Sequence, residues 1–497
     1  MTSAPAFVLA PPRLPELSLA GLALARETIT GTHLHTLHGC PHEVVLDFRL
    51  PKAEKLPASD ALAALLARGR AFEAEVVREL EVVEPQFAKG DFATGAAETL
   101  RLMREGHPLI YQGVLFRAPY LGIADLLRRV EVPSALGGHA YEVIDIKSSR
   151  KAKLEQQVQV AFYSLLLGEA QGLLPTHGAL WLRDAPEERF ALDDVVWTLL
   201  DQLDELGTLL RGERESRPHR SSRCDGCGWR ARCLPELLAT QDLSLLPSLS
   251  RSRAARLRAA GIADVAALAA AEPTALLRRR VLPPASTRAL QAQARARRDG
   301  TCVRLEAEPP KLPKRALFWA AELDPFREGR LWLVRAAVLE DGVVRAPMVQ
   351  LIEGEESEAR ALSELARFAE AHADAGALHF GERSATALAR LLATNPELAA
   401  LERLTRSQDL RVLWLAHLAH PIANASLYDL GLWLGLGELE EGGAFPALWW
   451  ENARESQGSE RERWRARVER FEQAELATAA RLVGELRAEA APGALSG

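Results

Sequence analysis

Two charged residues interrupt an otherwise apolar stretch, YEVIDIKSS, at 141–149. Tyr, Val and Ile in this spacing predict a buried β-strand, and side chains two positions apart leave a strand on the same face. Asp145 and Lys147 are therefore expected side by side, whereas Glu142 is expected on the opposite face and is not a first-choice ligand. A carboxylate beside an ammonium group on such a face can bind a metal ion and stabilise developing negative charge.

Two further acids lie where apolar side chains are expected. The pattern of residues 59–82 predicts an amphipathic helix, and Glu73 falls in the middle of its apolar arc. Residues 108–132 are expected to be extended, and there Asp125 follows the apolar residues of PYLGIADLL. A carboxylate on a buried face costs several kcal/mol unless it is paired or metal-bound. For each acid alone, a salt-bridged core residue or a turn cap is the structural alternative.

Taken together, Glu73, Asp125, Asp145 and Lys147 are residue types that can bind a metal ion and act on a phosphate. Two or three carboxylate oxygens are what a hard cation such as Mg²⁺ or Mn²⁺ needs. Such a metal binds a phosphate oxygen and lowers the pKa of an attacking water, while Lys147 would position that water or stabilise negative charge. On a helix predicted over 152–168, Gln159 and Tyr163 are four apart and share one flank.

In their order along the chain, these residues resemble the RecB-type branch of the PD-(D/E)XK nucleases. The resemblance spans residues 25–235 and rests on Gly69, Glu73, Asp125, Asp145, Lys147, Gln159 and Tyr163. It implies that the helix acid and the two strand acids bind the metal and that Lys147 is catalytic. It also implies that Gln159 and Tyr163 help to hold DNA. Many members have a histidine three residues after the helix glycine, where this chain has Phe72.

Three cysteines are clustered in CDGCGWRARC, at Cys224, Cys227 and Cys233, and a fourth, Cys40, lies near the start. Four such thiolates can close a tetrahedral site, and zinc sites use similar spacing. The same layout occurs in the iron–sulfur subset of RecB-like nucleases, which includes AddB and CRISPR-associated relatives. That resemblance implies a structural [4Fe–4S] cluster on these four residues, with Zn²⁺ as the alternative. The histidines around Cys40 are interpreted as incidental: His33, His35, His38 and His42.

The length of 497 residues is too great for one core, and we expect domains at 1–240, 241–311 and 312–497. There is no uncharged apolar run of about eighteen residues, so no membrane span is expected. The N-terminus lacks a basic region followed by an apolar core, so a cytoplasmic location is the default expectation.

The middle of the chain is basic although the net charge of the whole is −6. Residues 248–315 contain 15 Lys and Arg against 5 Asp and Glu, a local balance of +10. This suits a protein that meets phosphate in one place, or an arginine-rich solvated surface. Two short helical patterns meet at Gly261, which is typical of a helix-hairpin-helix that binds phosphate through its backbone or serves as a spacer.

Residues 312–497 resemble, more faintly, the RNase H-like fold of the DEDD exonucleases. The first strand of that family carries Asp-x-Glu, whereas FWAAELD has Ala320 and keeps only Glu322. The closing Tyr-x-x-x-Asp motif corresponds here to Phe471 and Glu475. Because loss of one acid weakens a two-metal site severely, we expect a degenerate exonuclease domain kept for binding or architecture. An unrelated α/β domain is the alternative.

The sequence thus predicts an α/β protein with a restriction-endonuclease-like core closed by an iron–sulfur cluster, a helix-hairpin-helix middle and an RNase H-like C-terminal domain. The expected function is a metal-dependent deoxyribonuclease. By family analogy it would be an exonuclease on single-stranded DNA or DNA ends in repair, recombination or defence. The alternatives are a non-catalytic nucleic-acid-binding module that keeps the nuclease fold and a zinc-stabilised scaffold.

Overall fold

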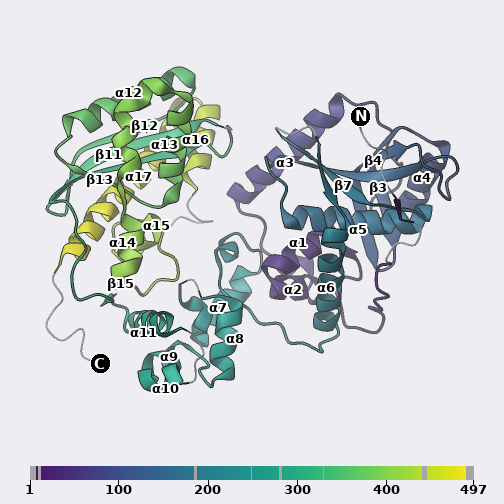
Figure 1. The fold of residues 1–497 in the computed structure, drawn as a ribbon, viewed down its shortest axis with the longest axis horizontal. Coiled ribbons are helices and arrows are strands. Elements are labelled where there is room, and N and C mark those ends of the chain that lie inside the picture. Colours follow the sequence, from purple (N-terminus) through teal and green to yellow (C-terminus); the bar gives the residue numbers. More distant parts are fainter. Residues whose placement is uncertain are drawn as a thin grey trace. The chain divides into compact units, whose positions relative to one another are not determined.

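The computed structural model describes residues 7–8, 13–183, 187–247, 249–278, 283–327, 329–438 and 445–488. The chain forms two compact units (Figure 1). The first unit consists of Met1–Ala58, Leu62–His219 and Gly226–Cys233, and the second of Ser59–Ala61, Arg220–Asp225 and Leu234–Gly497. The predicted middle segment, 241–311, is part of the second unit.

The elements of the first unit confirm the predicted helices at 59–82 and 152–168 and the strand at 141–147. Residues 108–132 form a hairpin of two strands. The strands are β1 (Phe7–Val8), β2 (Ile29–Thr30), β3 (Leu109–Arg117), β4 (Tyr120–Val130), β5 (Ala140–Lys147), β6 (Leu174–Pro175), β7 (His177–Leu182) and β8 (Glu188–Ala191). The helices are α1 (Gly31–Gly39), α2 (Pro41–Arg49), α3 (Asp60–Arg78), α4 (Phe92–Glu105), α5 (Leu154–Gln171), α6 (Asp193–Leu210) and the beginning of α7 (Arg230–Ala239), with the short 3-10 turn η1 (Lys52–Glu54). The turn η2 (Ser222–Asp225) and the residues of α7 from Leu234 onward belong to the second unit.

The main sheet of the first unit has the order β2–β4–β5–β7–β8, with β3 beside β4. Because β5 and β7 are parallel, the chain needs a crossover between them, and α5 supplies it. The alternation of β5 decides which face each side chain meets. Val143 packs in the core that α5 and α6 cover, whereas Ile144 and Ile146 pack with Phe72 and other residues of α3 on the opposite face. In Figure 1, α5 and α3 can be followed on either side of the strands.

Glu142 lies on the α3 side of β5 and takes part in a charge network. It is 2 % exposed, and its carboxylate accepts hydrogen bonds from Arg128 Nη2 at 2.5 Å and from Arg189 Nη2 at 2.9 Å. A buried carboxylate with two guanidinium partners is satisfied. Glu142 thus lies on the face of β5 that the sequence predicted for it, opposite Asp145.

The last segment of the first unit, Gly226–Cys233, packs against the chain that follows α2. The backbone N–H of Leu56 donates to the carbonyl of Gly228 at 2.9 Å, and Trp229 Nε1 donates to Asp47 Oδ1 at 2.9 Å. Trp229 is 2 % exposed, so its indole is an anchor for this segment. The cysteine-containing loop is therefore fixed to the N-terminal region by packing and hydrogen bonds of its own.

The second unit begins with short helices and continues as a mixed sheet with helices on both faces. The strands are β9 (Val303–Arg304), β10 (Arg315–Leu323), β11 (Leu331–Glu340), β12 (Val343–Leu351), β13 (Gly376–His379), β14 (Gln408–Asp409) and β15 (Leu418–Ala419). The helices are α8 (Arg251–Ala259), α9 (Val265–Ala270), α10 (Pro273–Arg278), α11 (Pro284–Asp299), α12 (Glu355–Ala371), α13 (Glu382–Thr394), α14 (Leu410–His417), α15 (Leu427–Trp433), α16 (Pro446–Glu455) and α17 (Gly458–Arg487), with 3-10 turns η3 (Leu243–Leu245) and η4 (Pro396–Arg406).

The sheet of the second unit has the order β12–β11–β10–β13–β14. Strands β10 to β12 form an antiparallel meander, and β13 and β14 extend it in parallel. One face packs against α14, α15 and α17, and the other against α12 and α13. Between α8 and α9, Gly261 has φ +83°, a conformation that glycine adopts without strain. Across the described ranges of the chain, none of the helices is both long and apolar enough to cross a membrane.

The packing of the cysteine-containing loop predicts that alanine substitution at two of its glycines, Gly228 and Gly226, changes the stability of the first unit by different amounts. A Cβ at Gly228 would lie 2.5 Å from Lys55 Cγ and 2.9 Å from the Leu56 carbonyl oxygen, whereas a Cβ at Gly226 would meet nothing within 4 Å. We expect Gly228→Ala to destabilise the first unit by about 1–3 kcal/mol and Gly226→Ala to have little effect. Equilibrium urea unfolding of the two variants checks this, and equal stabilities would contradict the packing described.

Candidate active site

The acidic residues of β4 and β5 meet where the ladder between these strands ends. The two strands pair from Val130 opposite Ala140 to Leu126 opposite Ile144, and no further pair follows. The next residue of β4, Asp125, uses its side chain instead, and its Oδ2 accepts a hydrogen bond from the backbone N–H of Ile146 at 2.8 Å. The strand N–H is thus satisfied without a partner strand, and a carboxylate is placed beside β5.

Asp145 is fully buried at this point. Its exposed fraction is 0 %, and its Oδ2 lies 2.5 Å from Nζ of Lys147, whose side chain is 25 % exposed. Within the described part of the chain, Oδ2 of Asp145 is paired with Lys147, whereas Oδ1 has no hydrogen bond. Burial of an ionised carboxylate is costly unless cations or donors surround it. The Asp145 site therefore favours positive charge beyond that of Lys147.

The charges of the site shift one another's pKa values. Burial and the nearby charge of Asp145 raise the pKa of Asp125 to about 7, although Lys147 and the N–H of Ile146 oppose this shift. A protonated Asp125 can also donate to Asp145, which raises the pKa of Asp125 further. Burial lowers the pKa of Lys147, but the carboxylates of Asp145, Asp125 and Glu73 outweigh it, so the pKa of Lys147 is raised. Lys147 is therefore a cation at neutral pH.

Glu73 extends from α3 toward the site, and two neighbouring side chains orient its carboxylate. Tyr111 Oη donates to its Oε1 at 3.0 Å, and Gln112 Nε2 donates to the same oxygen at 2.8 Å. Burial and the charge of Asp125 raise the pKa of Glu73, whereas Lys147 lowers it. Glu73 thus interacts electrostatically with Asp125 and Lys147.

Tyr111 and Gln112 are site residues that sequence reasoning missed. Both lie on β3, and Gln112 has φ +52°, which is unusual for a residue other than glycine. It lies between the pairs Tyr111–Leu126 and Gly113–Ala124, opposite Asp125. Backbone strain of this kind is found preferentially at functional sites. In the sequence they are ordinary strand residues, and no signal marked them.

Gln159 and Tyr163 lie together on α5, as predicted. Gln159 Nε2 is 2.8 Å from Tyr163 Oη, and Tyr163 is 6 % exposed. A Cβ at Gly122 would lie 2.7 Å from the Tyr163 ring, and a Cβ at Gly31 would lie 2.9 Å from the Gln159 side chain. Burial and the charge of Asp145 raise the pKa of Tyr163. The structure thus places Tyr163 in the wall next to Asp145, and its role in holding DNA stays a prediction.

A divalent cation would compensate the buried negative charge of Asp145 and Asp125. Both oxygens of Asp145 are buried, Oδ1 has no hydrogen bond within the described ranges, and the proximity of Asp125 creates repulsion that a cation would remove. Among the residues that the structure describes, no three His, Cys, Asp or Glu side chains are close enough to share a metal ion. Ligation by Glu73, Asp125 and Asp145 together therefore stays a prediction.

The predicted cluster cysteines lie in partly buried positions, and none of the five cysteines is in a disulfide. Cys40 lies between α1 and α2. The sulfur of Cys224 accepts from the N–H of Ser221 at 3.4 Å, and that of Cys227 accepts from the N–H of Trp229 at 3.4 Å. Backbone N–H groups directed at sulfur are suited to thiolates in a metal cluster. The described side chains do not form a cysteine metal site, so iron–sulfur ligation also stays a prediction.

Two of the histidines near Cys40, His33 and His42, form contacts with other residues of the first unit. His33 is 3 % exposed, accepts from the N–H of Thr30 at Nδ1 at 3.0 Å, and lies 3.1 Å from Arg26 through Nε2. Burial and the charge of Arg26 lower its pKa to about 4. His42 Nδ1 lies 2.9 Å from Ser216 Oγ. His33 and His42 thus have protein partners, and the interpretation of the four histidines as incidental stays a prediction.

The raised pKa of Asp125 predicts how stability depends on pH in the absence of metal. Because its pKa in the fold lies above its ordinary value of 3.8, its contribution is present below about pH 4 and is lost as pH rises through about 7. We expect Asp125→Asn to make the first unit more stable than the wild type at pH 8, by roughly 1–3 kcal/mol, and to remove most of this dependence. Denaturant unfolding in EDTA measures it. Asp201→Asn, on the exposed side of α6, is the control, and the same pH profile in the wild type and in Asp125→Asn would contradict the assignment.

The comparisons with known proteins agree with this geometry. No curated protein matches the chain at a significant level. A family model described as the PD-(D/E)XK nuclease superfamily matches residues 42–234, which include Glu73, Asp125, Asp145 and Lys147. This match supports a domain of the PD-(D/E)XK nuclease superfamily at residues 42–234.

Proposed function

We propose that this protein is a metal-dependent deoxyribonuclease that hydrolyses DNA phosphodiester bonds at the site formed by β4, β5 and α3. The observation that carries the proposal is the fully buried Asp145 paired at 2.5 Å with the partly exposed Lys147, beside Asp125 at the end of the β4–β5 ladder. Such a pair would be expensive in a merely structural strand. The superfamily match over residues 42–234 supports the same activity.

In this proposal each residue has a defined part. Asp125 and Asp145 would hold Mg²⁺ or Mn²⁺, and Glu73 would complete the donor set from α3. Such a cation would supply positive charge to the scissile phosphate and acidify an attacking water. Lys147 Nζ, held by Asp145 Oδ2, positions that water or stabilises the negative charge that develops on the phosphate.

Glu73 and Asp125 have further roles that follow from their neighbours. The hydrogen bonds from Tyr111 and Gln112 orient Glu73, so α3 does not have to fix this side chain alone. Because the pKa of Asp125 is near 7, this carboxylate loses its proton close to neutral pH, when it becomes free to bind a cation. Gln159 and Tyr163 form the wall of the site on α5 and would contact DNA from there.

The finer assignment follows the RecB-type resemblance. We propose an exonuclease that acts on single-stranded DNA or DNA ends in repair, recombination or defence. Cys40, Cys224, Cys227 and Cys233 would carry a structural [4Fe–4S] cluster, with Zn²⁺ as the alternative. The backbone N–H groups directed at Cys224 and Cys227 support sulfur ligation of a metal.

The second unit would contribute binding or architecture. The exposed Arg253 and Arg256 of α8, next to the Gly261 turn, support contact with a phosphate backbone. The meander of β10 to β12, extended by two parallel strands and covered by helices on both faces, supports the RNase H-like assignment. Ala320 in place of an acid supports its being catalytically degenerate.

Substitution of Lys147 tests the proposed activity. We expect Lys147→Ala to lower the rate of DNA cleavage at least about 100-fold and to leave DNA affinity within about 3-fold, because the lysine acts on the reacting phosphate. Lys151→Ala, four residues further along on an exposed side chain, is the matched control and should cleave normally. The measurement is cleavage of labelled single-stranded and double-stranded DNA with Mg²⁺ or Mn²⁺, alongside a binding assay. A wild-type protein that binds DNA but does not cut it would instead support the non-catalytic binding module.

The cysteine assignment predicts a coloured protein. Anaerobic purification should give the broad absorption of an iron–sulfur cluster and about four iron atoms per chain. Cys227→Ser should lose most of the absorption and iron, whereas Cys302→Ser, whose thiol has a pKa that burial raises to about 12, should keep both. A colourless protein that contains one zinc would contradict the cluster and leave the nuclease proposal untouched.

A further inference from the structure

A buried arginine lies in the middle of the sheet of the second unit. Arg335, on β11, has a side chain that is only 3 % exposed, and three carboxylates surround it. Its Nη2 lies 2.5 Å from Glu475 Oε2 and 3.7 Å from Glu322 Oε1, and its Nη1 donates to Glu472 Oε2. We call these four residues the Arg335 cluster.

Three elements bring the cluster together. Glu322 lies on β10, and Glu472 and Glu475 are three apart on α17, so they share one face of that helix. In the β10–β11 register, Arg335 stands directly opposite Ala320. Side chains directly opposite on antiparallel strands have Cβ atoms about 5 Å apart. The small side chain of Ala320 therefore leaves the guanidinium room to occupy the space over β10.

The cluster is rich in negative charge for so enclosed a place. Glu472 is 1 % exposed and Glu475 14 %, and Oε1 of Glu472 has no hydrogen bond within the described part of the chain. One guanidinium cannot neutralise three ionised carboxylates. Burial raises the pKa of Glu472 to about 8, with Arg335 opposing the shift and the other two acids adding to it. Ionisation of all three acids is therefore costly, even with the charge of Arg383 acting on Glu322 beside that of Arg335.

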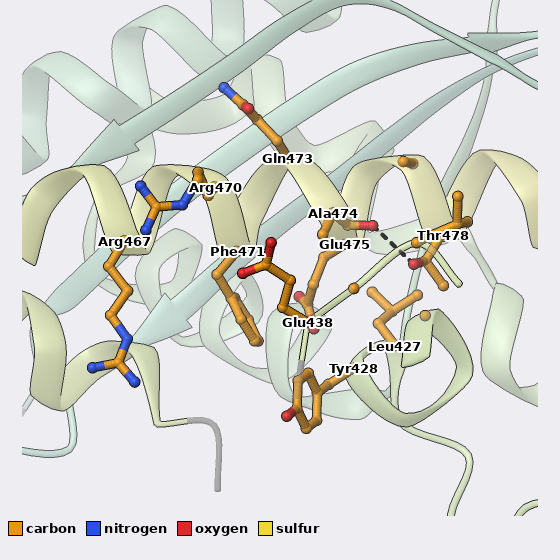
Figure 2. Close-up of a pocket in the computed structure, with 14 residues that line it drawn as sticks. Leu427, Tyr428, Glu438, Arg467, Arg470, Phe471, Gln473, Ala474, Glu475 and Thr478 are labelled. Atoms are coloured by element: carbon orange, nitrogen blue, oxygen red, sulfur yellow. Dashed lines mark hydrogen bonds between the residues drawn. The ribbon is translucent and has the colours of Figure 1, made fainter. Parts of the chain in front are cut away.

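A cavity lies next to the cluster. It has a volume of about 370 Å³, and Glu475 lines it together with Phe471, Glu438 and Tyr428. Figure 2 shows Glu475 and Phe471 extending from α17 toward this space and Tyr428 approaching from α15. One acid of the cluster, Glu475, therefore faces a cavity that Arg467 and Arg470 also line, whereas Arg335 itself is enclosed.

Carboxylates from a strand and a helix that converge in a partly enclosed space are what a hard divalent cation binds. We propose that Arg335 takes the place of such a cation, so that the second unit binds no divalent metal, and that removal of Arg335 turns Glu322, Glu472 and Glu475 into a metal site. A guanidinium can offer two N–H groups at once to different carboxylates, and its charge does not depend on pH in the working range. This assignment is independent of the nuclease site in the first unit.

The test removes the guanidinium from the full-length protein and supplies Mn²⁺. Arg335→Met should lower the melting temperature of the second unit by roughly 10 °C, because it leaves buried acids without their cation. Addition of 1 mM Mn²⁺ should restore at least half of this loss. Hydrogen exchange of peptides from β11 and α17 should slow with Mn²⁺ in the variant and remain unchanged in the wild type. These peptides separate the effect from metal binding at β4 and β5.

Three further variants make the outcome decisive. Arg335→Met combined with Glu472→Gln removes one repulsive charge, should fold more readily, and should still respond to Mn²⁺. Adding Glu475→Gln should abolish the response. Arg345→Met, at an exposed position on β12, is the matched control and should behave as the wild type.

Three results would overturn the proposal. The first is Mn²⁺ protection of β11 and α17 in the wild type, and the second is folded Arg335 variants that ignore Mn²⁺, which would make Arg335 a structural salt bridge only. The third is failure of both Arg335→Met and the double variant to give a cooperative transition even with Mn²⁺, since the cation would then not replace the guanidinium.

Discussion

The carboxylate of Asp145 is buried where the backbone of the sheet donates no hydrogen bond to it. The positions of Lys147 and Asp125 in the site depend on this buried negative charge. Lys147, two residues on, supplies the nearest positive charge. Asp125 is held alongside because its side chain replaces a missing partner of the β5 backbone. Each arrangement costs free energy in the absence of a ligand, and the cost is expressed as the raised pKa of Asp125. A binding partner with positive charge relieves all of these costs together.

The two units handle buried acids in different ways. In the first unit, the positive charge beside the acids is that of Lys147, whose side chain is 25 % exposed. Because a lysine side chain is flexible, it can move when another cation or a phosphate binds. In the second, the cation is the enclosed guanidinium of Arg335, held by carboxylates from two elements. The first arrangement suits a site that exchanges ligands, whereas the second suits a permanent internal contact. The difference follows from exposure and side-chain geometry, and both units retain an excess of acid.

Much of the site could be predicted because strand and helix periodicity translate spacing into direction. Asp145 and Lys147 share a face because they are two apart on β5, and Glu142 lies on the other face with Arg128 and Arg189 as partners. Tyr111 and Gln112 could not be predicted. Their importance arises from the unusual backbone at Gln112 and from the approach of α3, and neither has a local sequence signature. Arg335 was equally hidden, because a single arginine in an apolar strand gives no indication of the distant helix that contacts it.

By itself, the sequence determined which residues carry charge, which lie on the same face of an element, and the approximate positions of α3, β5 and α5, because these properties depend on neighbours along the chain. The tertiary structure alone decided that the β4–β5 ladder stops at Leu126, so that Asp125 turns to Ile146, and that Trp229 reaches back to Asp47. It also decided that α17 brings Glu472 and Glu475 to Arg335. These contacts join residues 21 to 182 positions apart. Their energies depend on burial and on the approach of other elements, and local spacing contains no information about either.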